Sequence, residues 1–502
     1  MAGDSSVIPA STTAPTEAVG SLARAGVVIL LLMMATIFLS GVILQIGVTP
    51  DFPWLLAAGD WILQHRQLPA TDLFSWTAAD RPWVLYQWGF EALLAAIHHL
   101  AGYDGVAVVF AWAVLITYLI VPLVSCRQRT PVMLLALLNA PILVVLTVNM
   151  SIRPMIVTSG GLLLQHLLIE ALRRRAIDPP KACCAVFLIY VGWANLHTGF
   201  TLGIIALLLT MLGDWLEPRL RRGSERPAAL APMQVSALIV AATFGSMLTP
   251  YGLQLHMYVA SLASAAAINA RIDELSQPDY SFKQFQLFLA LVLLFVVAVL
   301  RQPRAARPAD ILLVASSVLA TLFAARFVVW AALYLSLMLP DAVARAWPSV
   351  RRTCTLPSSR SLTWIIALAT LMVPPSLIAY GVTDPVGPLC KPVLPAIHAY
   401  LAARSTHDHL LTDPITGSCM IAAAPGVPVF IDTRFDFYGS EFSTETLDAL
   451  AVRPGWNNFL SRYAINIAVL ERSRPLAQAF AVDKRFSLLY GDDEAVVVRR
   501  LP

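Results

Sequence analysis

The sequence predicts an α-helical polytopic membrane protein, with about eleven transmembrane helices and a small C-terminal α/β domain on the extracytoplasmic side. Hydrophobic residues make up 58% and charged residues 13% of the 502 positions, and the mean hydropathy is +0.69. A soluble domain carries about 25% charged residues. Basic residues also recur in every second connection between apolar runs, and the pattern changes to short strands and helices after about residue 383. Lipid is therefore the expected solvent for residues 24–382.

The predicted membrane domain begins after a tail at 1–23, which is rich in Ser, Thr, Ala and Pro and is expected to be disordered in the cytoplasm. The apolar run at 26–47 can cross a bilayer of about 30 Å and has no cleavage-site pattern, so we expect a retained first helix. Ten further spans are expected near 104–125, 131–150, 155–171, 182–197, 200–216, 229–249, 285–300, 310–325, 327–344 and 362–381.

The distribution of basic residues predicts the orientation. Cytoplasmic loops carry an excess of Lys and Arg, and the basic clusters here are Arg24; Arg127 and Arg129; Arg173, Arg174, Arg175 and Lys181; Arg219, Arg221, Arg222 and Arg226; Arg301, Arg304 and Arg307; Arg345, Arg351, Arg352 and Arg360. An odd number of spans then places the N-terminus inside and residues 383–502 outside a bacterial inner membrane. These loops explain the net charge of +4, which gives no indication of nucleic-acid binding.

Two long loops, 48–103 and 250–284, are expected on the outer side. In the first, the apolar pieces at 54–64 and 88–100 are too short to span and contain Trp, which predicts helices in the membrane interface. The second is expected to be helical in its middle and broken at Pro278.

The outer domain at 383–502 is predicted to contain helices at 393–404, 443–451 and 456–463. The predicted strands are HLLTD, VPVFID, INIAVL, FSLLYG and EAVVVRR, typical of a small α/β or α+β module. Cys390 and Cys419 are its two cysteines, and they form either a disulfide or two buried thiols. The other four, Cys126, Cys183, Cys184 and Cys354, are expected on the cytoplasmic side.

Polar residues gather at the outer ends of the predicted helices, where a charge near hydrocarbon costs about 2.5 to 3.5 kcal/mol. They are Asp51, Glu91, Arg153, Asn195, His197, Tyr251, His256, Asp273, Glu274 and Arg326. An acid beside several arginines at a lipid-accessible surface suits the binding of a lipid phosphate, with the carboxylate as general base. Each residue has a structural alternative: helix capping for Asp51, Glu91 and Asp72, headgroup contact for Arg153 and Arg326, and a turn hydrogen bond for Asn195 and His197.

Several segments carry a resemblance to a known family. DFPWLLAAGDWIL, LPATDLFSWTAADRPWVLYQWGFEALL, IRP, GWANLHTGF, LTPYGLQL, RIDELSQPDY and VFIDTRFDFYG occur in the order seen in a broad group of bacterial membrane proteins. That group is similar to the C-type, polyprenyl-phosphate-sugar-dependent glycosyltransferases, and the resemblance covers about residues 48 to 498.

The resemblance implies a chemistry. Asp51 corresponds to the family's catalytic carboxylate, which deprotonates or orients the acceptor hydroxyl. The family follows this acid with paired Trp and a His, whereas this chain has Pro53, Trp54 and Leu55, so the His position is lost. The implied reaction is inverting transfer from a polyprenyl-phosphate-linked sugar to an envelope glycan, lipid or protein acceptor. No two-acid metal motif is present, so no obligatory metal or other cofactor is expected.

The implied substrate contacts are Arg153 and Arg326 on the donor phosphate, with Asn195, His197, Glu91 and Tyr251 completing the site. A carboxylate of Asp51 more than about 15 Å from both guanidiniums would exclude such a site. Asp432 and Arg434 either bind the acceptor or form an internal pair that fixes a turn. A transporter of lipid-linked saccharides or a non-catalytic envelope-assembly protein are alternative functions. The sequence has no internal repeat, and its polar residues lie at one face, which favours the enzyme.

Overall fold

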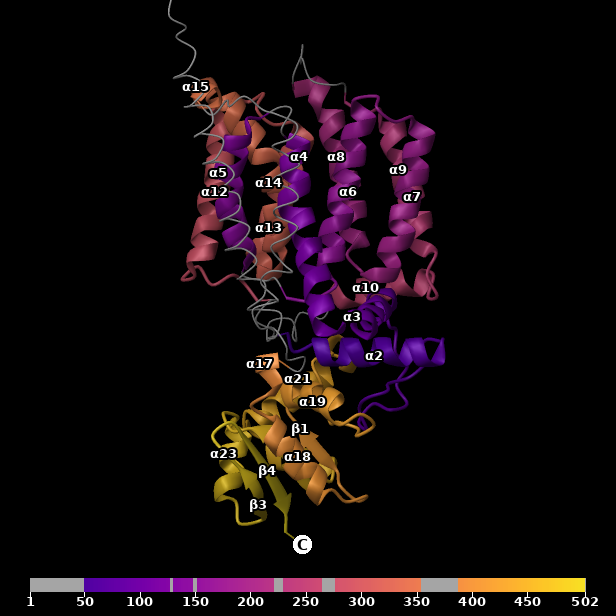
Figure 1. Ribbon diagram of the computed structural model, residues 1–502, viewed down its shortest axis with the longest axis vertical. Coiled ribbons are helices and arrows are strands. Elements are labelled where there is room, and N and C mark those ends of the chain that lie inside the picture. Colours follow the sequence, from indigo (N-terminus) through magenta and orange to yellow (C-terminus); the bar gives the residue numbers. More distant parts are fainter. Residues whose placement is uncertain are drawn as a thin grey trace, which may run out of the picture.

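The computed structural model describes residues 49–126, 130–147, 151–220, 229–263, 276–353 and 387–501. The predicted tail and first span, the last predicted span, and the pair Asp273 and Glu274 lie outside these ranges. A helical bundle forms one end of the molecule and the C-terminal domain the other (Figure 1). Between them lie α2 (Phe52–His65) and the start of α3 (Trp88–Leu115).

Five helical segments within the described residues are long and apolar enough to cross a membrane: Trp88–Ser125, Met155–Arg173, Phe200–Leu220, Lys283–Arg301 and Ala325–Ala346. Shorter apolar helices, among them Pro232–Met247 and Pro308–Phe323, stand beside them. The chain thus has the architecture of a multi-pass membrane protein, although the described residues do not reach the predicted count of eleven spans.

The bundle contains α5 (Val132–Leu146), α6 (Met155–Arg173), α7 (Pro179–Leu196), α8 (Phe200–Leu220), α9 (Pro232–Met247), α12 (Lys283–Arg301), α13 (Pro308–Phe323) and α14 (Val328–Ala346). Nearly every residue of α14 is buried, so this helix is central. The helices α8 and α13 approach closely at Gly213, where a Cβ atom would lie 2.2 Å from the Cα atom of Ala309. Glycine is therefore required at this contact.

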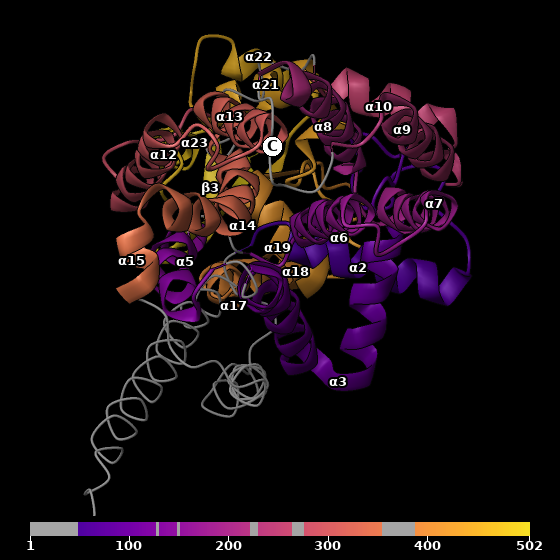
Figure 2. The same cartoon turned by 90° about the horizontal axis from the view of Figure 1, so that it is seen from above.

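The helix α3 corrects one predicted boundary. The expected interfacial helix at 88–100 and the span from 104 form one bent helix, which Figure 2 shows from above. The bend lies at Gly102, whose φ of 63° and ψ of −162° are not helical and suit a residue without a side chain. The chain continues through the π-helix η1 (Ile116–Ile120) into α4 (Val121–Cys126).

The C-terminal domain is built on a four-stranded sheet of order β1-β2-β4-β3, with β1 (Leu410–Thr412), β2 (Ile467–Glu471), β3 (Phe486–Gly491) and β4 (Ala495–Arg500). The pair β1 and β2 is parallel and the other two pairs are antiparallel. Its helices are α17 (Gly387–Cys390), α18 (Leu394–Ala403), α19 (Pro414–Ala423), α20 (Phe435–Tyr438), α21 (Ser440–Leu450), α22 (Trp456–Arg462) and α23 (Pro475–Val482). A disulfide between Cys390 and Cys419 joins α17 to α19.

The predicted strand VPVFID is wrong as a strand of this sheet. Val429 makes an isolated parallel bridge with Ser75, in which the Val429 amide donates to the Phe74 carbonyl at 2.8 Å and the Trp76 amide to the Val429 carbonyl at 3.1 Å. The Thr77 hydroxyl also donates to the Phe430 carbonyl at 2.6 Å. The backbone of this apolar segment forms its hydrogen bonds with the loop 66–87 instead. This loop therefore packs into the C-terminal domain.

Candidate active site

The candidate site lies where the bundle meets the C-terminal domain. Asp51 precedes α2 and Arg153 precedes α6, and the Asp51 Oδ2 atom lies 3.1 Å from the Arg153 Nε atom. The two side chains are 23% and 14% exposed, so the pair remains accessible to solvent. Asp51 occupies the N-cap position of α2, yet the carboxylate makes no capping hydrogen bond within the described part of the chain. Its two shortest contacts are instead with Thr433 and Arg153, which are distant in the sequence.

The C-terminal domain completes the surroundings of Asp51. The Thr433 hydroxyl donates a 2.6 Å hydrogen bond to Asp51 Oδ1, and the Trp54 indole nitrogen donates to the Thr433 hydroxyl at 3.1 Å. Because a threonine hydroxyl has one hydrogen, Thr433 relays a chain of donors from Trp54 to the carboxylate. Sequence reasoning missed Thr433, which is separated from Asp51 by 382 positions and has no local signal.

Arg326 belongs to η4 (Ala325–Phe327), the turn between α13 and α14. Its charge interacts with Tyr86, whose hydroxyl also feels the charges of Asp436 and Asp51. Burial and the two carboxylates raise the pKa of Tyr86 well above its usual value, while Arg326 opposes the shift. Tyr86 therefore lies within electrostatic reach of Asp51, Asp436 and Arg326 and stays protonated at neutral pH.

Asp432 and Arg434 form an internal cluster. Arg434 donates to the Asp432 carboxylate through Nε at 2.9 Å and Nη2 at 2.6 Å, and its Nη1 lies 2.7 Å from Asp72 Oδ1. The Arg434, Asp432 and Asp72 side chains are at most 1% exposed. The Trp83 ring lies 4.5 Å from the guanidinium carbon. An acceptor cannot reach these atoms in this structure, and the arrangement is the internal pair, extended to the loop 66–87.

Asn195, His197 and Tyr251 make hydrogen bonds within the scaffold. The Asn195 amide donates to the Val191 and Leu248 carbonyls at 2.8 Å. The His197 Nδ1 atom lies 2.6 Å from the Thr158 hydroxyl, and the Tyr251 hydroxyl accepts from the Leu85 amide at 3.0 Å.

The side chains of Glu91 and His197 are buried. Direct substrate contact is therefore not available to them in this structure. Glu91 also lies where α2 and α3 pack closely, because a Cβ on Gly59 would meet the Glu91 backbone carbonyl at 2.1 Å.

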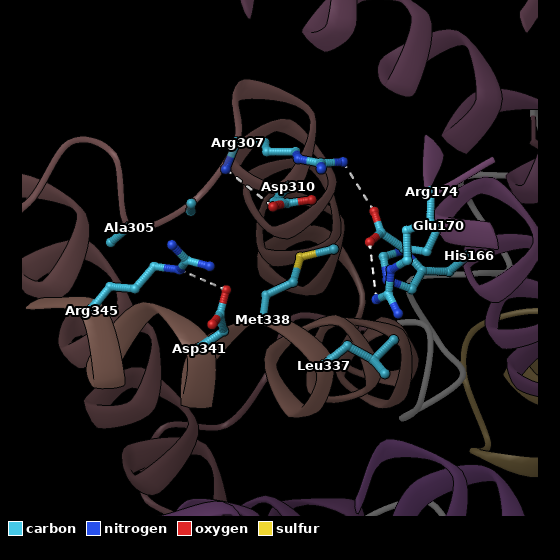
Figure 3. Close-up of a pocket in the computed structure, with 11 residues that line it drawn as sticks. His166, Glu170, Arg174, Ala305, Arg307, Asp310, Leu337, Met338, Asp341 and Arg345 are labelled. Carbon is cyan, nitrogen blue, oxygen red and sulfur yellow. Dashed lines mark hydrogen bonds and ion pairs between the residues drawn. The ribbon is translucent and has the colours of Figure 1, made fainter. Parts of the chain in front are cut away.

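A second polar site lies at the far end of the bundle, about 25 Å along α6 from Arg153 at 1.5 Å per residue. Figure 3 shows residues that line a pocket there. Its empty space is about 630 Å³, part of it open to solvent. Arg307 pairs with Glu170 at 3.0 Å and Arg345 with Asp341 at 3.0 Å. Because Arg307 at the start of α13 pairs with Glu170 of α6, this pocket has the character of an ion-pair network that joins two helices.

No group of three or more His, Cys, Asp or Glu side chains in the described ranges is placed to hold a metal ion. Around Asp51 the partners are a guanidinium, a hydroxyl and an indole. These groups suit the positioning of a carboxylate beside an anion.

Comparison with known proteins shows a similarity of fold. No family model and no curated protein matches the sequence. The archaeal oligosaccharyltransferase AglB from Archaeoglobus fulgidus, in complex with an inhibitory peptide and a dolichol-phosphate, is similar with a TM-score of 0.54 and 11% identity, over 89% of this chain and 69% of that one. The apo form of the A. fulgidus enzyme is similar with a TM-score of 0.51 and 11% identity, over 89% of this chain and 69% of that one.

The form of that enzyme tethered to an acceptor peptide with the NVT sequon has a TM-score of 0.50 and 12% identity, over 88% of this chain and 68% of that one. The chain therefore has a fold similar to that of a membrane oligosaccharyltransferase.

Proposed function

We propose that this protein is a membrane glycosyltransferase that moves a sugar from a polyprenyl-phosphate donor to an extracytoplasmic acceptor. The observation that carries the proposal is the pair of Asp51 and Arg153, at the end of the bundle that faces the C-terminal domain, in a fold similar to an oligosaccharyltransferase. One similar structure is named for its complex with a lipid phosphate and a peptide, which supports partners of these two kinds here.

In the proposed reaction Asp51 accepts the proton of the acceptor hydroxyl. The acceptor oxygen then forms a bond to the anomeric carbon of the donor sugar. The bond from that carbon to the phosphate oxygen breaks, and its electron pair leaves with the polyprenyl phosphate. A single displacement of this kind inverts the anomeric centre. Thr433 and Trp54 hold the carboxylate in place, as general-base catalysis requires.

Arg153 and Arg326 are proposed to bind the donor phosphate and to stabilise the charge that develops on it as it leaves. A guanidinium has five N–H donors in a planar fork, of which the Arg153 Nε faces Asp51. In the proposed complex, Arg153 would contact the base and the phosphate together. The lipid tail would remain beside the bundle, which fits a site at the end of the apolar helices.

The orientation is part of the proposal. The alternation of basic loops favours an extracytoplasmic C-terminal domain in a bacterial inner membrane. The disulfide between Cys390 and Cys419 supports the same placement, because disulfides persist in oxidising compartments.

The test is transfer of radiolabelled sugar from a panel of polyprenyl-phosphate donors by membranes that contain the wild type or Asp51→Asn. Loss of a general base is expected to lower the rate about 10²- to 10⁴-fold. Asp60→Asn is the matched control, because Asp60 lies on the same helix and pairs with the half-exposed His99 at 2.8 Å. Transfer by Asp51→Asn at the wild-type rate would contradict the assignment. No transfer by the wild type would favour envelope assembly or transport.

A further inference from the structure

Asp436 stands on α20 and faces two outer elements. Its Oδ2 atom accepts a 2.9 Å hydrogen bond from the hydroxyl of Tyr258, which belongs to α10 (Leu253–Ala263). Tyr86, from the end of the loop that precedes α3, interacts with the same carboxylate. The two tyrosine rings lie 5.5 Å apart with 32° between their planes. Three segments far apart in the sequence thus meet at one carboxylate.

Asp436 differs from the other acids of this region. Asp51, Asp72 and Asp432 each pair with an arginine. Asp436 keeps solvent-accessible surface although protein surrounds its carboxyl group, and it forms no ion pair with a Lys or Arg among the described residues. Its hydrogen-bonding neighbours are neutral tyrosines. A carboxylate offers about four acceptor positions, so it retains capacity for a ligand beyond the two tyrosines.

This cluster lies close to the proposed base. Thr433 donates to Asp51, and Asp436 follows it by three residues, which span at most about 11 Å. Tyr86 also interacts with both Asp51 and Arg326. One bound molecule is therefore able to contact Asp436 and Asp51 together.

We propose that Asp436, Tyr86 and Tyr258 form the acceptor subsite and that the acceptor is a saccharide; this rests on the proposed glycosyltransferase function. Sugar hydroxyls donate to the Asp436 carboxylate in charge-assisted hydrogen bonds. The tyrosine rings offer a flat apolar surface to the C–H face of a sugar ring. The Asp436 carboxylate would repel a phosphorylated or otherwise anionic acceptor, although Arg434 and Arg326 lie within electrostatic reach of the cluster.

The first experiment measures binding without turnover. The full-length protein in nanodiscs is titrated with labelled disaccharides of glucose, galactose, mannose and N-acetylglucosamine. The wild type is expected to bind at least one, and Asp436→Asn to bind it about 10- to 100-fold more weakly, the loss of one hydrogen bond to a charged group. Asp448→Asn is the control, because Asp448 belongs to the same domain but pairs with the exposed Arg453. Binding to none of the four, or equal binding by Asp436→Asn, would overturn the subsite.

The second experiment separates the subsite from the reaction. In the transfer assay, Asp436→Asn and Tyr258→Phe are expected to raise the KM for the acceptor by about tenfold or more, and to leave the KM for the donor within about twofold. A change in the donor KM alone would contradict the assignment. If disaccharide binding depends on Asp436 while the wild type transfers no sugar, the subsite stands and the proposed function fails.

Discussion

Replacement of Arg434 by methionine is expected to loosen the contact between the C-terminal domain and the loop 66–87. The guanidinium bridges Asp432 of the domain and Asp72 of the loop, and all three side chains are at most 1% exposed. Methionine keeps an unbranched side chain but removes the charge, so two buried carboxylates lose their partner. Removal of one member of a buried ion pair costs about 3 to 5 kcal/mol.

This free-energy cost would make the contact between the C-terminal domain and the loop 66–87 open much more often. A factor of ten corresponds to about 1.4 kcal/mol, so opening of the contact becomes between about a hundredfold and a few thousandfold more frequent. The amides of Ser75 and Val429 report it, because they donate to Asp72 Oδ2 at 2.8 Å and to the Phe74 carbonyl at 2.8 Å. Their hydrogen–deuterium exchange in nanodiscs is expected to accelerate accordingly, while amides of α6 exchange as in the wild type.

Arg462→Met provides the matched control. Arg462 pairs with Glu445 in the same domain, but the two side chains are 61% and 33% exposed. Such surface pairs contribute about 0 to 1 kcal/mol, so exchange should change by no more than about fivefold. If Arg434→Met leaves the Ser75 and Val429 amides within that range, the buried cluster does not hold the domain to the loop, and the reasoning is refuted.

Three further predictions concern the same end of the molecule. Thr433→Val removes the donor to Asp51 and should lower kcat about 10- to 100-fold, whereas Thr433→Ser should restore most of it; equal rates for all three proteins would exclude a positioning role. Cys390→Ser removes a disulfide with a sequence separation of 29, which contributes about 3 to 4 kcal/mol of stability in the chain-entropy account. The variant should therefore have a lower Tm in a thermal melt. Reductant should lower the Tm of the wild type but not that of the variant. Because burial raises the pKa of Asp436, and only the carboxylate accepts sugar hydroxyls at all its positions, disaccharide binding should fall as pH drops through a value above the ordinary aspartate range of about 3.9; Asp436→Asn should show no such fall, and an identical pH profile would remove Asp436 from the subsite.

Local patterns predicted much of the fold. The strand at 486–491 and the helix at 394–403 follow from alternation and turn residues within short windows. VPVFID has equally strong strand character, yet its partner is Ser75, more than 350 positions away. Which partner an apolar segment chooses depends on tertiary packing, and no local pattern contains that information.

The candidate site was also predictable from the sequence only in part. The topology placed Asp51 and Arg153 at one face, and their 3.1 Å contact lies far inside the 15 Å limit that the hypothesis required. The sequence could not distinguish polar residues that face the site from those that hold helices together. Asn195 and His197 have the composition of a binding motif, but their hydrogen bonds join the end of α7 to the end of α9 and to α6.

The hydrogen bond between Thr433 and Asp51 has a consequence for biosynthesis. A ribosome makes the carboxylate at the beginning of translation and its hydroxyl partner 382 residues later. At about 5 to 20 residues per second, at least about 20 s separate the two events. During that interval a nascent chain already inserted in the bilayer carries Asp51 without the group that orients it. In the proposed glycosyltransferase, the hydrogen-bonded Asp51 site is therefore complete only after the C-terminal domain has been made and has folded.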